Sequence, residues 1–218
     1  MKASDPANPV EHTIQARCTT KRLADSPLPA HGDRALVEAV ITAAGWAPFH
    51  RPSANVHRSE LASIVPWRCY ALDAPECRQL RDRLQAARDT SKIPQLLATA
   101  TALIQVTWLP NPPKAPNEQL FDPTLDNMEH LAAASSAVQN MLLAATARGV
   151  PNYWSSGGAL REPNVFAMLG IPAGEILLGA IFLFPTKTDV AESVPGKLRD
   201  LRGPIDSWAK WTTLSDFA

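Results

Sequence analysis

The stretch NMEHLAAASSAVQNMLLAATAR, residues 127–148, carries the strongest fold signal in this chain. Apolar side chains recur in it every three or four residues, which is the spacing of one face of an α-helix. They are Leu131, Ala134, Val138, Met141, Leu142 and Ala145. Residues 132–137 are all alanine or serine, so a second backbone or a flat ligand can approach them closely. The stretch predicts a long central helix that faces a partner, with the core helix of a monomer as the alternative.

Strands and helices alternate on the N-terminal side of this helix. Asp33 is suited to cap a helix, and the run from Asp73 to Glu76 has the arrangement of a capping box. The two segments that we interpret as strands are rich in aromatic or β-branched side chains. In chain order we expect a helix from Asp33 to about Ala44, a strand at 66–72, a helix from Asp73 to about Arg88 and a strand at 101–109.

Two segments are predicted to be surface loops. One is the proline-rich loop at 109–123, whose five prolines can continue neither a helix nor a central strand. The other is an insertion-like run at about 50–64. Because surface loops tolerate change and often carry specificity, we expect both to shape substrate entry more than folding.

On the C-terminal side, residues 150–158 form a turn-like run that leads into another helix. Glu162 and Pro163 open that helix and Gly170 closes it. Residues 176–184 are short and continuously apolar, which predicts a buried strand. The tail at about 186–218 is polar apart from aromatic residues that would anchor it to a partner. The pattern is that of an α+β fold with helices around one sheet, in a single domain over residues 1–218.

The bulk composition excludes several classes of function. The 218 residues include 21 basic and 21 acidic side chains, so no overall field attracts nucleic acid or an anionic membrane. The first ten residues lack the apolar core of a secretion signal, and no segment reaches the eighteen or so apolar residues of a membrane span. We therefore expect a cytoplasmic protein with neither nucleic acid nor membrane as a partner.

Motifs for hydrolysis, metal binding and dinucleotide binding are absent from the sequence. It contains no G-x-S-x-G, no G-x-G-x-x-G and no phosphate-binding P-loop. Three cysteines, at 18, 69 and 77, form no C-x-x-C pair, and the five histidines are scattered without an H-E-x-x-H. We expect no metal site.

Two basic runs remain, near opposite ends of the chain. Residues 17–22, RCTTKR, offer guanidinium, hydroxyl and ammonium donors that suit one phosphate and one polar ring edge. Residues 197–202, KLRDLR, are basic again. Either run alone is typical of a solvated surface, but together they are suited to bracket one anionic ligand.

Taken in order, these segments resemble the flavin nitroreductase family. That family begins with an Arg-x-Ser/Thr-x-Arg/Lys element, which residues 17–21 match, and continues with an Ala-Pro-Ser…Gln/Glu-Pro-Trp segment. This chain has Ala47-Pro48-Phe49-His50 and Val65-Pro66-Trp67 there. The central helix, the turn at 150–158, the run Leu169-Gly170-Ile171-Pro172, the last strand and a basic element at 199–208 follow in the family's order. The resemblance spans about residues 11–208.

The resemblance implies an α+β sandwich, with an antiparallel four-stranded core sheet between helices. It also implies a homodimer in which the C-terminal tail is exchanged and donates a fifth strand, with FMN at the interface. Arg17 and Thr19 would contact the phosphate or ribityl end, Lys21 the pyrimidine edge, and Arg202 the phosphate, with Arg199 and Lys197 as alternatives. The complete predicted cofactor site is Arg17, Cys18, Thr19, Lys21, Trp154, Ser155, Ser156, Gly157, Arg199 and Arg202.

The activity implied is that of an FMN-dependent NAD(P)H oxidoreductase with ping-pong kinetics. NADH or NADPH would give electrons, and a nitroaromatic, quinone or related small electrophile would accept them. No side chain is expected to act as a catalytic acid or base, because the flavin carries the chemistry. The alternatives are a reductive dehalogenase, a flavin-fragmenting enzyme on the same scaffold, or a flavin-binding module that is not an enzyme.

The chain departs from the family pattern at several positions. Phe49-His50-Arg51 replaces polar residues that usually follow Ala-Pro, and Val65 stands where the family has Gln or Glu. A second pyrimidine-edge lysine has only Lys92 as a distant candidate.

Overall fold

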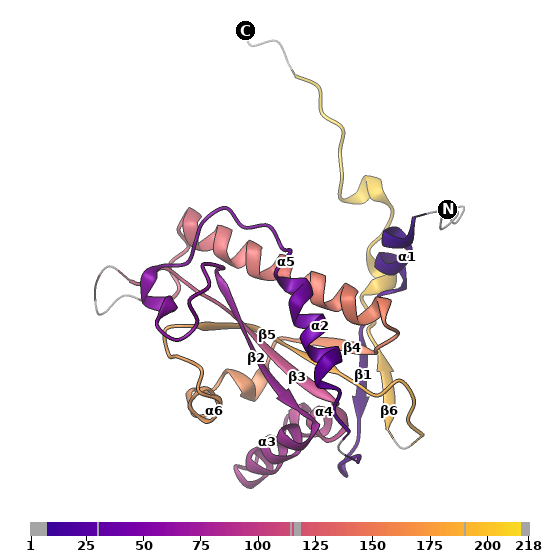
Figure 1. Cartoon of the computed structure of the whole chain (residues 1–218). Coiled ribbons are helices and arrows are strands. Elements are labelled where there is room, and N and C mark those ends of the chain that lie inside the picture. The colour runs from indigo at the N-terminus through magenta and orange to yellow at the C-terminus, as the bar shows by residue number, and fades with distance from the viewer. Residues whose placement is uncertain (1–7, 30, 114, 116–118, 190, 215–218) are drawn as a thin grey trace.

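A four-stranded antiparallel sheet in the order β2-β3-β5-β4 forms the centre of the computed structural model, which describes residues 8–29, 31–113, 115, 119–189 and 191–214 (Figure 1). Its strands are β2 (Trp67–Asp73), β3 (Ala102–Trp108), β4 (Asn152–Ser155) and β5 (Ile176–Leu183). A second, two-stranded sheet pairs β1 (Thr20–Leu23) with β6 (Glu192–Pro195) in antiparallel fashion. β3 and most of β5 are buried, which explains why both segments are almost continuously apolar.

Helices cover both faces of the central sheet. α2 and α5 pack on one face, and α3, α4 and α6 pack on the other (Figure 1). The α-helices are α1 (Pro9–Ala16), α2 (Arg34–Ala44), α3 (Ala74–Ala86), α4 (Ile93–Thr99), α5 (Leu125–Ala147) and α6 (Pro163–Leu169). The short 3-10 turns are η1 (Asn55–Arg58), η2 (Gly158–Arg161), η3 (Arg199–Leu201) and η4 (Ile205–Ser207).

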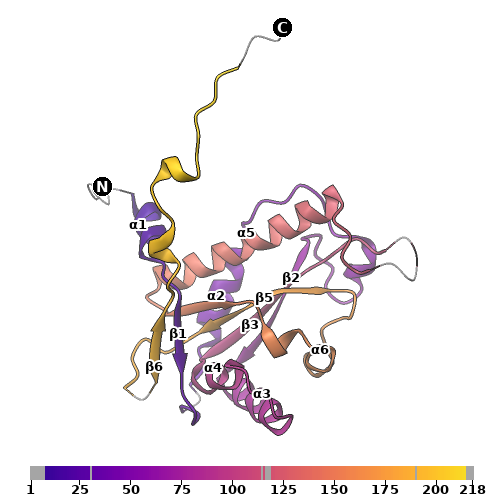
Figure 2. The same ribbon diagram turned by 180° about the vertical axis from the view of Figure 1, so that it is seen from behind.

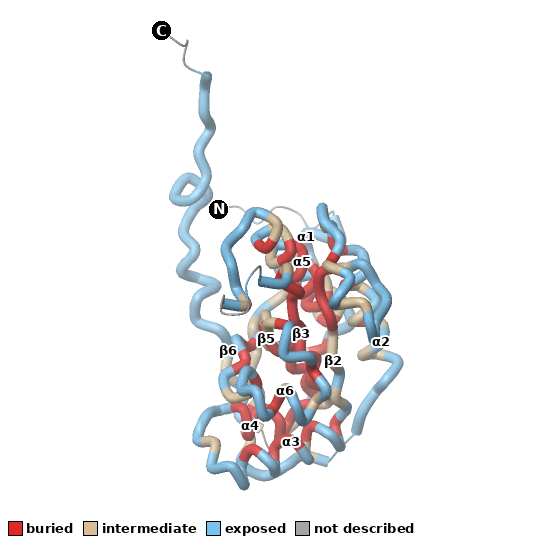
Figure 3. Tube along the Cα trace, turned by 90° about the vertical axis from the view of Figure 1, so that its left-hand side faces the viewer, coloured by how far each residue is buried: buried red, intermediate tan, exposed pale blue. Residues whose placement is uncertain are grey.

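The sheet divides the interior into two hydrophobic clusters. Successive side chains of a strand point to opposite faces, so Ile181 and Leu183 of β5 join the cluster under α2 and α5. Ala180 and Phe182 of the same strand join the cluster under α3, α4 and α6. The buried residues therefore line both faces of the sheet, while the chain after β6 is exposed (Figure 3). This arrangement confirms the expected α+β class with helices on both sides.

Elements with a local signal in the sequence formed as expected. The Asp33 carboxylate accepts a hydrogen bond from the Leu36 amide at 2.9 Å and caps α2. The Asp73 carboxylate accepts one from the Glu76 amide at 3.1 Å and caps α3. α6 ends at Gly170, whose φ of 66° lies in the left-handed region.

Five elements were not expected from the sequence: α1, β1, α4, β4 and β6. Three of them are strands of only four residues, too short for a period-two pattern to show. β1 lies beside the main sheet, because Thr19 forms an isolated parallel bridge with Asn152 at the start of β4. β6 pairs with β1 of its own chain (Figure 2). The donation of a strand to a partner therefore stays a prediction.

Several residues of the alanine and serine run of α5 are buried within this chain. Ala133, Ala134 and Ala137 are buried in the cluster under α2 and α5. The Asn140 side chain donates to the Ala43 carbonyl of α2 at 3.3 Å, which ties the two helices together. The small side chains thus allow the close approach of α2 and the sheet, so they give no support to a dimer interface at this position.

Parts of the predicted segments lie outside the described residues: residues 1–7 of the polar N-terminal stretch, 114 and 116–118 of the proline-rich loop, and 190 and 215–218 of the tail. In the part of the chain that the structure describes, no helix has both the length and the apolar character needed to cross a lipid bilayer.

Candidate functional site

A hollow of about 450 Å³ lies where the beginning and the end of the chain meet beside β4. The segment that leads into β1 supplies Arg17, Cys18 and Thr19 to its lining, and β1 itself supplies Lys21. β4 supplies one residue, Tyr153. The segment after β6 completes the wall with Lys197, Arg199 and Arg202, among others. The two basic runs of the sequence, about 180 residues apart, therefore face one cavity.

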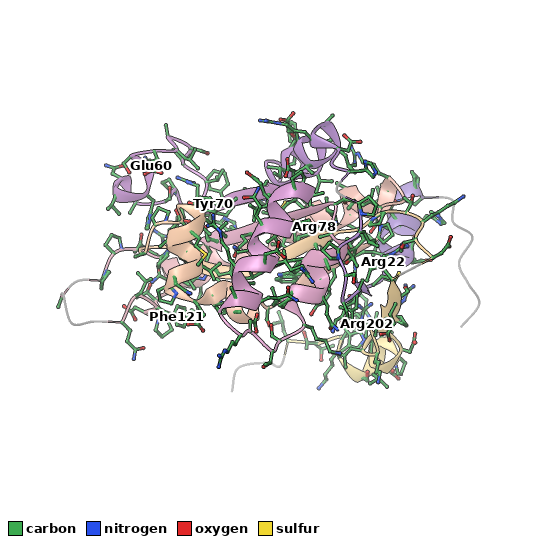
Figure 4. The ribbon with its side chains drawn as sticks, turned by 90° about the horizontal axis from the view of Figure 1, so that it is seen from below. Arg22, Glu60, Tyr70, Arg78, Phe121 and Arg202 are labelled. Atoms are coloured by element: carbon green, nitrogen blue, oxygen red, sulfur yellow. The ribbon has the colours of Figure 1, made fainter. Side chains whose placement is uncertain are left out.

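Backbone pairing between β1 and β6 brings these segments together. Lys21 lies opposite Val194 in the register, and the Gly196 amide donates to the Thr19 carbonyl at 2.8 Å. A Cβ atom at position 196 would lie only 2.9 Å from the Thr19 Cβ, so this close approach requires glycine. Figure 4 shows Arg22 of β1 and Arg202 toward the same end of the molecule, far from Glu60 in the insertion-like run.

Arg199 is engaged in holding the N-terminal helix. Its guanidinium donates to the Gln15 carbonyl and, at 3.3 Å, to the Arg17 carbonyl at the C-terminal end of α1. Cations stabilise the carbonyl end of a helix, so this contact orders the backbone of Arg17. Arg199 thereby positions Arg17, and Arg202 is the arginine of this segment that is left to face a ligand.

The hollow concentrates positive charge, because five lysine and arginine side chains line it beside a single carboxylate, Asp200. Among the residues that the structure describes, no carboxylate lies within 4.0 Å of the cationic groups of Arg17, Lys21 or Arg202. Asp200 lines the hollow too, but it forms no such pair in this part of the chain. Burial lowers the pKa of the Arg17 guanidinium most, and the charge of Arg202 lowers it further. Cys18 opposes this shift by a smaller amount, and Arg199 adds the smallest lowering effect. Like charges held together in this way favour an anionic ligand.

Tyr153 lines the hollow but is not among the site residues predicted from the sequence. The Lys21 ammonium lies 4.9 Å from the centroid of its ring, within the range of a cation–π contact. The residue stands inside the turn-like run 150–158, but only the strand pairing shows that its side chain faces the hollow.

The remaining predicted residues, Trp154 to Gly157, follow Tyr153 at the end of β4 and do not line the hollow. Ser155 is buried at the end of β4, and its hydroxyl accepts a hydrogen bond from the Gly157 amide at 3.2 Å. Arg161 donates to the Ser156 carbonyl at 2.5 Å and holds the turn from outside. Gly157 has a φ of 108°, which other residues rarely adopt. Trp154 is 40% exposed.

A second hollow, of about 330 Å³, lies between α6 and the start of β5 and offers a ligand little polar chemistry. Its cation, Arg161, already donates to the carbonyls of Ser156, Leu177 and Leu178. Its carboxylate, Glu175, accepts hydrogen bonds from the hydroxyls of Tyr70, at 2.9 Å, and Thr107. The larger, basic hollow is therefore the better candidate site.

The positions at which the sequence departs from the family pattern lie elsewhere. Arg51 forms ion pairs with Asp126 at 3.0 Å and Glu129 at 2.9 Å, which tie the insertion-like run to α5. Lys92 is exposed at the start of α4 and does not line the basic hollow. Within the described ranges, no group of histidine, cysteine or carboxylate side chains is arranged to hold a metal ion.

The donor set of the hollow fits a phosphate-bearing ligand. Guanidinium groups bind phosphate through charge-assisted hydrogen bonds, and the hydroxyl of Thr19 adds a neutral donor. The volume also lies within the range of roughly 300–1,000 Å³ that is typical of small-molecule and cofactor sites.

Comparison with known proteins agrees with this geometry. The model of the Nitroreductase family matches residues 14–183. No curated protein matches the chain closely enough to count as a relative.

Several solved structures share the fold. A nitroreductase-like family protein from Bacillus cereus superposes with a TM-score of 0.65 at 21% identity, covering 96% of this chain and 99% of the other. A nitroreductase with bound FMN from Desulfitobacterium hafniense has a TM-score of 0.55 at 19% identity, over 94% and 99% of the two chains. A nitroreductase with bound FMN from Bacteroides fragilis has a TM-score of 0.51 at 20% identity, over 83% and 90%. At these identities the likeness concerns the fold alone.

Proposed function

This chain belongs to the nitroreductase family, and from that premise we propose that it is an FMN-dependent NAD(P)H oxidoreductase. Its substrates are nitroaromatic, quinone or related small electrophiles. The observation that carries the proposal is the basic hollow, in which Arg17, Lys21 and Arg202 face one cavity without an acidic partner among the described residues.

The roles of the side chains follow from their chemistry. Arg17 and Arg202 bind the phosphate of FMN, and the Thr19 hydroxyl contacts the phosphate or the ribityl chain. One phosphate suits this site, because the chain lacks the glycine-rich fingerprint of dinucleotide-binding folds. Two solved structures of the same fold, described above, carry bound FMN.

Bound FMN supplies the hydride chemistry, which leaves the protein to orient the reactants and to place charge. Lys21 places a cation at the pyrimidine edge, where it stabilises the negative charge of the reduced ring. The turn at 155–157 presents backbone groups to the ring edge. Donor and acceptor use the same open face in turn, and no side chain is needed as an acid or base.

The active form is a homodimer. Its support is the chain after β6, which runs away from the body of the molecule and exposes large apolar side chains (Figure 2). Leu198, Leu201, Trp208, Trp211 and Leu214 are each more than two-thirds exposed. Such a surface is stabilised by a partner of the same kind.

An absorption spectrum of the purified protein, recorded before and after anaerobic addition of NADH or NADPH, tests the proposal. We expect flavin absorption in the visible range, release of FMN and not FAD on denaturation, and bleaching by one of the two donors. A colourless protein that takes up no added FMN contradicts the cofactor assignment. Bound FMN that neither donor bleaches contradicts the enzyme assignment and favours a flavin-binding module.

A further inference from the structure

The Lys21 side chain lies over the face of the Tyr153 ring at the wall of the hollow. Its ammonium lies 4.9 Å from the centroid of the Tyr153 ring, and both residues line the cavity. No carboxylate within the described residues lies close enough to pair with this ammonium. The negative face of the Tyr153 ring is therefore its recorded electrostatic partner.

Tyr153 is held rigidly from behind. It pairs with Phe182 in the antiparallel ladder between β4 and β5, and the two rings stack with centroids 6.2 Å apart and planes inclined by 21°. Phe182 stacks in turn on Phe184, again at 6.2 Å and at 7°. Both phenylalanines are fully buried in the cluster under α3, α4 and α6. The Tyr153 ring, which ends this stack, therefore lines the hollow with little freedom to move.

The two backbones that carry Lys21 and Tyr153 are also joined. Thr19, two residues before Lys21, bridges to Asn152, the residue before Tyr153. Asn152 is itself buried, and its side-chain amide donates to the Val150 carbonyl at 3.0 Å. The separation between ammonium and ring is therefore determined by paired main chains and by the stacked Tyr153 ring, as well as by the flexible side chain of Lys21.

We propose that Tyr153 is a positioning residue that holds the Lys21 ammonium inside the hollow and so controls how strongly this cation acts on a bound flavin. Without the ring, the partly exposed Lys21 side chain would extend into water, where its charge is screened. The inference rests on the proposed function, since it assigns Lys21 to the flavin. The Tyr153 side chain acts through Lys21 and takes no part in electron transfer.

The reduction potential of bound FMN is the quantity that responds to this arrangement. A cation beside the ring stabilises the anionic reduced form more than the oxidised form, so a better-placed cation raises the potential. If loss of the ring weakens this preference about fivefold, the potential of the two-electron couple falls by about 20 mV. The affinity for oxidised FMN should change by less than about threefold, because the arginines that bind the phosphate are unaffected.

The experiment compares five proteins: wild type, Tyr153→Leu, Tyr153→Phe, Lys21→Met, and the double variant that combines Tyr153→Leu with Lys21→Met. Each is titrated as apo-protein with FMN, and the potential of the bound flavin is measured against reference dyes. Tyr153→Phe keeps the ring face and should match wild type, whereas Tyr153→Leu should lower the potential. Lys21→Met should lower it at least as far. In the double variant, Tyr153→Leu should add nothing to Lys21→Met, because the effect passes through the ammonium.

Packing is separated from electrostatics by a fluorinated phenylalanine at position 153, which keeps the shape of the ring and weakens the negative charge of its face. Its potential should lie below that of Tyr153→Phe, which keeps the inference testable even if Tyr153→Leu fails to fold. Equal potentials in the fluorinated and unfluorinated variants, or an additive shift in the double variant, would overturn the inference while leaving the proposed function intact. Failure of the wild type to bind FMN would overturn both.

Discussion

Arg17 is the side chain on which the cofactor assignment depends most. It lines the hollow, and its backbone carbonyl accepts a hydrogen bond from Arg199. Burial, and to a lesser extent the charge of Arg202, lowers the pKa of its guanidinium. A charge-assisted hydrogen bond contributes about 1.5–3 kcal/mol. Arg17→Ala should therefore weaken FMN binding about tenfold to a hundredfold or more in a titration of apo-protein.

Arg34→Ala is the matched control, since that arginine is on the exposed surface of α2 and forms an ion pair with Glu38. It should leave FMN binding unchanged. An Arg17→Ala protein that also binds FMN as tightly as wild type would show that Arg17 is a solvated surface charge.

The two arginines of the segment after β6 should behave differently. Arg202 is left to face the ligand, so Arg202→Ala should weaken FMN binding about tenfold or more without a loss of stability. Arg199 donates to the carbonyls of Gln15 and Arg17, so Arg199→Ala should destabilise the docking of α1 and lower the melting temperature of the protein. Thermal melts of the apo-proteins beside FMN titrations distinguish them. The assignment fails if Arg199→Ala weakens binding more than Arg202→Ala at unchanged stability.

The three thiols should differ in reactivity for a physical reason. Burial raises the pKa of the Cys77 thiol to about 12, and it does the same for Cys69 against a smaller opposite effect of Arg68. Both thiols therefore stay protonated until the pH approaches that value, and only a thiolate reacts readily. Cys18 is exposed in the wall of the hollow.

At pH 8 a disulfide reagent should modify one thiol of the native protein quickly and three in denaturant. Cys18→Ser should abolish the fast reaction, and bound FMN should slow it in the wild type. Two or more fast equivalents in the native protein would contradict the protection of Cys77, which is buried, and of Cys69, which is partly buried.

At the scale of elements, Arg68 on β2 organises the insertion-like run. Its guanidinium donates to the carbonyls of Val65, Trp67, His57, Leu61 and Ser63, at distances of 2.7–3.1 Å. The residue is buried, and desolvation lowers its pKa while Glu175 opposes that shift. The His57 ring also contacts the Pro110 carbonyl at 2.7 Å, so the two predicted surface loops are joined.

Arg68→Met should destabilise the protein by about 3 kcal/mol or more, because several carbonyls lose a charged donor at once. Chemical denaturation measures this change. Arg83→Met on the exposed side of α3 is the control and should stay within about 0.5 kcal/mol of wild type. A similarly small effect of Arg68→Met would mean that water replaces the guanidinium and that the run is not an ordered element.

For the whole molecule, the prediction concerns assembly. Trp211 is fully exposed and Trp208 is 69% exposed on a segment that contacts little of its own chain (Figure 3). Burying such rings in an interface contributes strongly to association. Light scattering should give the mass of a dimer, and Trp208→Ala with Trp211→Ala should shift the equilibrium toward monomer by at least tenfold in dissociation constant.

The control is Leu61→Ala, on the insertion-like run at the opposite end of the molecule, which should not alter the mass. A wild-type monomer that binds FMN would remove the dimer from the proposed function and would leave the cofactor site in place.

The sequence by itself determined the elements whose signals are local. Helix caps at Asp33 and Asp73, the helix end at Gly170 and the period of α5 all depend on interactions within a few residues. The same holds for the apolar strands β3 and β5. For the site, the ordered motifs indicated the residues of the two basic runs, and six of the ten predicted residues line one hollow.

Only the tertiary structure decided how those segments meet. β1, β4 and β6 are four residues each, and Thr20 pairs with Pro195 far away along the chain. Their strand conformation is stabilised by partners that no local window contains. The same long-range pairing places the Tyr153 ring beside Lys21. It also brings Arg199 to the C-terminal end of α1, where its guanidinium binds backbone carbonyls and is not left to bind the ligand. A pattern of residue types specifies which groups are available, whereas non-local pairing and packing determine which groups face each other.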